Sequence, residues 1–131
     1  MSSTDTSIRI THVGTVIVPV SDQDRAIEFY TGKLGFEKRA DIPMGEAMRW
    51  VEVAPPGAAT TVAIVPPREG DPVGVETRIA FTTDDVDADH ASLKAQGVDV
   101  DDEVTRFGGP VPPMFFLRDQ DQNKLLIVQR S

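Results

Sequence analysis

The order of the expected secondary-structure elements repeats along the chain, and this repeat constrains the fold more than any other feature of the sequence. A strand, a helix and three further strands are expected in each half of the 131 residues. Three pairs of identical residues share one spacing of 62 positions: Asp22 and Asp84, Ala26 and Ala88, Gly35 and Gly97. A repeated supersecondary unit predicts two similar halves that pack against each other.

The first half begins with residues 8–20, which are rich in Ile, Val and Thr and predict a long strand. Ser21, with Asp24 three residues later, predicts the start of a helix, and Gly35 predicts its end. Three more strands are expected at residues 36–42, 48–54 and 60–65.

Residues 66–74 hold three prolines and two glycines and predict a linker between the halves. A strand is then expected at 76–82, a helix that opens at Asp84 with Asp87 and ends at Gly97, and strands at 98–104, 113–117 and 124–129. The sequence therefore predicts one α+β domain over residues 1–131, with a first module at about 8–66, a linker at about 67–75 and a second module at about 76–131.

Composition excludes several classes of function. Thirteen basic against 21 acidic residues give a net charge of −8, which disfavours binding to nucleic acid or to an anionic membrane surface. The chain has no cysteine, and hence no disulfide or thiolate metal ligand. Residues 1–7 lack the pattern of a signal peptide, and no apolar run is long enough to span a membrane. We therefore expect a cytoplasmic protein.

Several sequence motifs mark the two halves. Val20-Ser21-Asp22, the run Arg-Ala-Ile-Glu-Phe-Tyr at 25–30 and Leu34-Gly35-Phe36 mark the first half, and Asp-Gln-Asp-Gln-Asn at 119–123 marks a turn in the second. With these motifs the chain resembles the vicinal oxygen chelate superfamily of glyoxalase I, extradiol dioxygenases and bleomycin-resistance proteins. The resemblance implies two βαβββ modules whose mixed sheets curl around an open cavity, with a homodimer completing or bordering the site.

The same resemblance implies four positions for metal ligands, on the first and last strand of each module. Carried onto this sequence, they fall on Thr15, Ile64, Arg78 and Leu126. None of these side chains is an anionic or imidazole donor, and arginine keeps its proton. We therefore expect no metal and no other cofactor.

Glu52 interrupts an apolar strand and shares its parity with Trp50. On a pocket-lining face, Glu52 is the candidate general base or the partner of Arg78. The alternative, which the sequence leaves open, is that Arg49, Val51 and Val53 face inward and Glu52 is solvated.

Two histidines and a set of apolar residues complete the candidates. His12 differs in strand parity from Thr15, so we expect it to point away from the pocket, and His90 is expected as a partly buried core residue. Residues 107–113 predict a pocket rim. The expected ligand-binding set is Thr15, Trp50, Glu52, Ile64, Arg78, Phe107, Met114, Phe116 and Leu126.

By resemblance to the bleomycin-resistance branch, the leading hypothesis is a metal-free homodimeric protein that binds and sequesters a small hydrophobic or aromatic natural product, as in antibiotic resistance. The alternative is an enzyme of the superfamily: either a metal-independent lyase, isomerase or hydrolase with Glu52 or a histidine as base, or a glyoxalase-like or dioxygenase-like enzyme with an unusual metal site. A third hypothesis is a subunit or regulatory partner without small-molecule chemistry.

Overall fold

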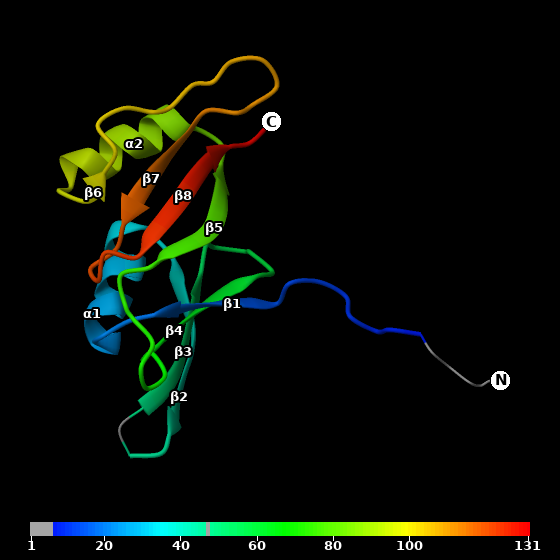
Figure 1. Ribbon diagram of the computed structural model, residues 1–131, viewed down its shortest axis with the longest axis vertical. Coiled ribbons are helices and arrows are strands. Elements are labelled where there is room, and N and C mark those ends of the chain that lie inside the picture. The colour runs from blue at the N-terminus through cyan, green and yellow to red at the C-terminus, as the bar shows by residue number, and fades with distance from the viewer. Residues whose placement is uncertain (1–6, 47) are drawn as a thin grey trace.

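The computed structural model describes residues 7–46 and 48–131 and contains two four-stranded mixed sheets, each with a helical segment (Figure 1). The first module comprises β1 Thr15–Pro19, α1 Gln23–Ile27, η1 Glu28–Lys33, β2 Glu37–Met44, β3 Met48–Ala54 and β4 Thr61–Val65. The second comprises β5 Glu76–Thr83, α2 Val86–Ala95, β6 Asp99–Val100, β7 Met114–Arg118 and β8 Lys124–Gln129. The strand orders are β1-β4-β3-β2 and β5-β8-β7-β6, so the predicted duplication of a βαβββ unit is confirmed.

The first strand is shorter than predicted. Its expected range was 8–20, whereas β1 covers Thr15–Pro19. β1 pairs in parallel with the five residues of β4, from Thr15 opposite Thr61 to Pro19 opposite Val65. Residues 8–13 have no ladder partner, and Figure 1 shows this part of the chain running away from both sheets. A segment forms a strand only where a neighbouring strand pairs with it. The content of β-branched residues alone therefore overestimated the length of β1.

Both helical segments begin one residue later than predicted. Asp22, rather than Ser21, caps α1 by accepting hydrogen bonds from the backbone N–H groups of Asp24 and Arg25. Asp85, rather than Asp84, caps α2 and accepts from Ala88. The first helical segment continues as the π-helical turn η1.

Both helical segments are followed by a glycine, as predicted. Gly35 and Gly97 have φ of +75° and +81°, a conformation that glycine adopts at little cost.

The strand expected at residues 98–104 is also shorter. Only β6, Asp99–Val100, pairs with β7, and one isolated bridge joins Thr105 to Met114. The interrupted pairing leaves residues 106–113 as a loop before β7.

One hydrophobic core joins the two modules. It includes Val18 and Ile64 from the first sheet, Tyr30 from η1, and Phe115 and Leu125 from the second sheet. Alternate residues of β7, β8 and the second part of β3 are buried in this core, and the residues between them are partly exposed on the other side of each sheet.

A buried polar contact fastens the second module to the first. The Tyr30 hydroxyl donates to Asp119 Oδ2 at 2.7 Å, and Asn123 Nδ2 donates to the same oxygen at 3.0 Å and to the Pro19 carbonyl at 2.8 Å. Ser21 donates its backbone N–H and its hydroxyl to the Asp121 carboxylate. The turn at 119–123 therefore holds the junction between β1 and α1.

Among the described residues, no helix is long and apolar enough to cross a membrane. The prediction about an N-terminal signal concerns mainly residues 1–6, which lie outside the described residues.

Candidate functional site

The open face of the first sheet is the side of β1, β3 and β4 that points away from the core. Residues that pair across a sheet share a face. Ile17 and Glu52 both pair with Ala63, and Thr15 pairs with Thr61, so all of them lie on one face. Trp50 lies two residues before Glu52 and shares this face. Their neighbours Val51 and Val53 are fully buried on the core side. The structure thus brings together Thr15, Trp50 and Glu52 of the predicted site.

A short hydrogen-bond network holds the Glu52 carboxylate in place. Trp50 Nε1–H donates to Glu52 Oε2 at 2.6 Å, and the Thr61 hydroxyl donates to Oε1 at 2.7 Å. The hydroxyls of Thr15 and Thr61 are 2.9 Å apart and extend this network to β1. The indole ring and the carboxylate therefore have fixed relative positions on an accessible sheet surface.

These hydrogen bonds stabilise the ionised carboxylate. The pKa of Glu52 is lowered from its ordinary value, first by the hydrogen bond from Trp50 and then by that from Thr61, and partial burial opposes the shift only in part. Glu52 is consequently negatively charged at neutral pH and a weaker base than an ordinary glutamate. The arrangement favours recognition of a hydrogen-bond donor over proton abstraction.

The open face of the second sheet carries a different set of side chains. Met114, Phe116, Leu126 and Lys124 share this face, because Phe116 pairs with Leu126 and Met114 with Val128 in the ladder between β7 and β8. The Lys124 ammonium lies 4.1 Å from the centre of the Phe116 ring, which is a cation–π contact. Met114, Phe116 and Leu126 are half-buried, so part of each side chain remains available to a ligand.

Ile64 does not line an open face, and this prediction was wrong. The side chain is fully buried in the core beside Val18, its partner in the β1–β4 ladder. In the ladder between the first and last strand of each module, Val18 pairs with Ile64 and Phe81 pairs with Ile127. Ile64 therefore corresponds to Ile127, and the residue that corresponds to Leu126 is Ala63. The spacing is 62 between Gly35 and Gly97 but 63 between the caps Asp22 and Asp85. Because side chains alternate along a strand, this difference of one residue in the offset places the predicted Ile64 on the core face instead of the open face.

Arg78 and Phe107 lie apart from the Glu52 network. Arg78 has φ of +61° within an irregular stretch of the β5–β8 ladder and lines a cavity of about 520 Å³ with Val13 and Phe81. No ion pair joins Arg78 to Glu52 among the described residues, so the predicted pairing across the pocket is not formed. Phe107 lies on the loop before β7 and is 69% exposed.

The ligand positions of the metal enzymes do not suit a cation in this chain. With Ala63 in place of Ile64, the four positions hold Thr15, Ala63, Arg78 and Leu126. A divalent transition metal needs carboxylate, imidazole or thiolate donors, and none of these side chains supplies one. Residues 7–46 and 48–131 hold no group of three or more His, Asp or Glu placed to bind a metal ion.

A slot lies next to the open face of the first sheet. It has a volume of about 570 Å³ and is formed by Ile17, Pro19 and Val65 with linker residues such as Pro67 and Pro72. Ile17 belongs both to this slot and to the row that contains Ala63 and Glu52. The surface around the Glu52 carboxylate therefore continues into an apolar depression under the linker.

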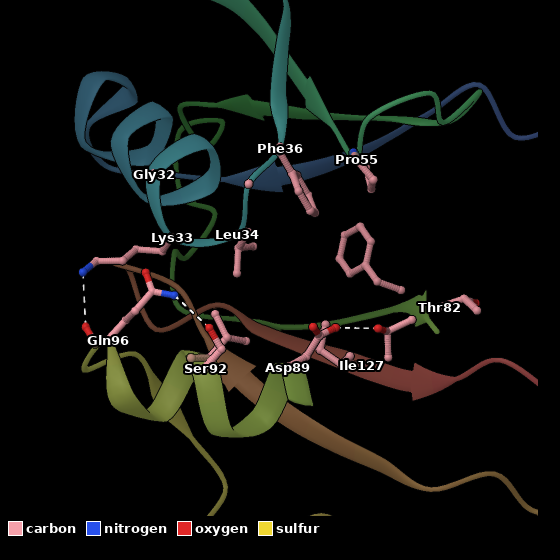
Figure 2. A pocket seen from close by; sticks show the side chains of 14 residues that line it. Gly32, Lys33, Leu34, Phe36, Pro55, Thr82, Asp89, Ser92, Gln96 and Ile127 are labelled. Atoms are coloured by element: carbon pink, nitrogen blue, oxygen red, sulfur yellow. Dashed lines mark hydrogen bonds between the residues drawn. The ribbon is translucent and has the colours of Figure 1, made fainter. Parts of the chain in front are cut away.

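A third cavity, of about 390 Å³, lies between the modules on their helical side (Figure 2). Leu34 and Phe36, which follow η1, face Asp89 and Ser92 of α2 across it. Lys33 Nζ donates to the Gln96 carbonyl at 3.2 Å at one end. Its lining includes none of Thr15, Trp50 and Glu52, so this groove is separate from the open face.

The histidines occupy the surroundings expected for them. His12 is exposed, and its Nδ1 lies 2.8 Å from the Thr11 hydroxyl oxygen. His90 is half-buried, with Nε2 at 2.6 Å from the Asp101 carbonyl and its ring edge-on to Phe115. Neither contacts Glu52.

Thr61 and Ile17 adjoin the Glu52 network on the open face and were not among the predicted residues. Thr61 supplies one of the two donors to Glu52, and Ile17 connects the network to the apolar slot. The signal for Ile17 was its parity with Thr15 on one strand. No comparable signal existed for Thr61, because its partnership with Glu52 depends on how β3 pairs with β4.

The sequence model of the Glyoxalase/Bleomycin resistance protein/Dioxygenase superfamily matches residues 9–127. The chain therefore belongs to this superfamily, and the two βαβββ modules are the fold expected of it.

Particular relatives cover nearly the whole chain. TnmS3, an antibiotic binding protein from Streptomyces sp. CB03234, has a similar crystal structure with a TM-score of 0.83 and 37% identity over 95% of this chain and 100% of that one. A superfamily member from Sphaerobacter thermophilus DSM 20745 also has a TM-score of 0.83, with 33% identity over 92% and 98% of the two chains. The uncharacterized protein YetH of Bacillus subtilis (strain 168) is 35% identical over 90% of this chain and 98% of its own length.

Proposed function

We propose that this protein binds and sequesters a small, largely hydrophobic or aromatic molecule on its open sheet faces, without a metal ion. The observation that carries the proposal is the pairing of the Trp50 ring with an ionised Glu52 on an accessible sheet surface. Ile17, Ile42 and Met44 are 60%, 55% and 51% exposed on the first sheet. Exposed apolar side chains gathered around a few polar groups are typical of a ligand site.

The open face of the second sheet is the other surface that we propose for the ligand, with Met114, Phe116 and Leu126 as its contact residues. The similarity to TnmS3, an antibiotic binding protein, supports a ligand from among antibiotics or related natural products. Catalysis by Glu52 is less well supported, since the hydrogen bonds that lower its pKa also weaken it as a base.

We also propose that the protein acts as a homodimer. β1 is an edge strand of the first sheet, and the residues before it expose Ile8, Ile10 and Val13. An edge strand preceded by exposed apolar side chains favours association. Sedimentation velocity should show a dimer in wild type and a shift toward monomer in Ile10→Lys; a monomeric wild type at micromolar concentration would refute this part.

The binding proposal is tested with the fluorescence of Trp50, the only tryptophan of the chain. A panel of aromatic antibiotics is titrated, and the expected result is saturable quenching by at least one compound, with an affinity that EDTA leaves unchanged. Calorimetry with Trp50→Phe should show weaker binding of the same compound, because the ring contact is reduced. Binding that requires added divalent metal, or no binding by any compound together with stoichiometric metal in the purified protein, would contradict the proposal.

A further inference from the structure

The charge of Glu52 is balanced differently from that of Asp41 and Asp101, which are both paired with an arginine. Asp41 lies 2.9 Å from Arg49, and Asp101 lies 2.7 Å from Arg118. In contrast, the two hydrogen-bond partners of Glu52 are the neutral donors of Trp50 and Thr61. Within the described part of the chain, no Lys, Arg or His nitrogen lies at ion-pair distance from it.

The two neutral donors also leave acceptor capacity on the carboxylate. An ionised carboxylate has about four lone-pair positions, and Trp50 and Thr61 use one on each oxygen. The remaining positions are on a half-buried side chain at the sheet surface. A ligand group can therefore reach Glu52 without displacing either donor.

Covering this carboxylate with a neutral apolar molecule is unfavourable. Such a ligand removes water from an ionised group and offers no hydrogen bond in return, which weakens its binding. An ammonium group restores the lost interactions with a charge-assisted hydrogen bond. The acidic chain, with net charge −8, attracts cations further.

We propose that the ligand class is an arylalkylamine in its protonated form, with the ammonium on Glu52, the ring system against Trp50 and the apolar remainder along Ile17 toward the slot under the linker. This inference rests on the proposed binding function and adds the charge and orientation of the ligand. The exposed apolar side chain of Ile17 and the slot of about 570 Å³ provide the room for the remainder.

Three naphthalene compounds that differ in one substituent test the charge requirement: 1-naphthylmethylammonium, 1-naphthalenemethanol and 1-naphthoate. Dissociation constants are measured by NMR titration of the single indole N–H signal, which belongs to Trp50. In wild type we expect the ammonium to bind about tenfold more tightly than the alcohol, because one charge-assisted hydrogen bond is worth about this factor. The naphthoate should bind most weakly.

Two variants complete the experiment. Glu52→Gln should reduce the ratio between ammonium and alcohol to about one while keeping binding of the alcohol. Glu103→Gln makes the same change of net charge at an exposed position in the segment between β6 and β7, and should keep the wild-type ratio.

The outcomes separate this inference from the proposed function. Equal affinities for ammonium and alcohol in wild type, or an unchanged ratio in Glu52→Gln, would overturn the inference while binding itself stands. If a cationic side chain of a second copy of the chain is the true partner of Glu52, Glu52→Gln should keep the ratio of ammonium to alcohol affinity and should also change the oligomeric state seen in sedimentation. That result too would overturn the inference. If neither the ammonium nor the alcohol shifts the indole signal, the inference is overturned, and the proposed function is then decided by the titration with antibiotics.

Discussion

Replacing Tyr30 with phenylalanine removes one hydroxyl from the contact that fastens the two modules. That hydroxyl donates to Asp119 Oδ2 at 2.7 Å, and both residues are buried, so water cannot replace the lost donor. Asp119 keeps three other donors, namely Asn123 Nδ2 and the backbone N–H groups of Asp121 and Asn123. A hydrogen bond to a charged group contributes about 1.5–3 kcal/mol. We expect Tyr30→Phe to lower the free energy of unfolding by about 2 kcal/mol.

Urea denaturation at pH 7, followed by circular dichroism, measures this change, and the m-value should stay constant. Ser21→Ala is the matched control, because it removes an exposed hydrogen bond to Asp121 at the same junction and should cost less than about 1 kcal/mol. A Tyr30→Phe protein within about 0.5 kcal/mol of wild type would refute the reasoning that this buried contact stabilises the fold.

The same variant has a signature at alkaline pH. The pKa of Tyr30 is raised well above its ordinary value, first by burial and then by the negative charge of Asp119. Above about pH 10 the unfolded chain loses the tyrosine proton while the folded chain keeps it. Folded protein then binds more protons, so stability is complete below that pH and falls as the pH rises. This part of the alkaline slope should be absent in Tyr30→Phe.

Three further predictions follow from burial, backbone geometry and charge. Phe115→Ala should cost about 3–5 kcal/mol in urea denaturation because the ring is fully buried, whereas Phe116→Ala, on the open face, should cost much less and weaken ligand binding in calorimetry. Gly97→Ala should cost about 1 kcal/mol or somewhat more, because φ there is +81°; an unchanged denaturation midpoint would contradict this. Glu52 has a lowered pKa, so its contribution to stability is present above the pKa of the unfolded chain and is lost as pH falls through the folded pKa; Glu52→Gln should flatten the stability profile below about pH 4.5.

The local pattern of the sequence was sufficient for the order of elements and for part of the site. Strand, helix and three strands occur twice as predicted, and Gly35 and Gly97 follow the helical segments because glycine tolerates positive φ. Trp50 and Glu52 were expected on one face because side chains alternate along a strand, and the structure places them there with a direct hydrogen bond. These are properties of one segment and need no knowledge of its neighbours.

Long-range pairing decided the rest. The length of β1 depends on the five residues of β4, and the face of Ile64 depends on a spacing that changes from 62 to 63 between the modules. Thr61 reaches Glu52 only through the pairing of β3 with β4, and Tyr30 meets Asp119 across 89 residues of sequence. Alternation along a strand determines which residues share a side, but the partner strand and the packed core determine which side is open. That choice is made by hydrogen bonds and apolar burial between distant segments, and these exist only in the folded chain.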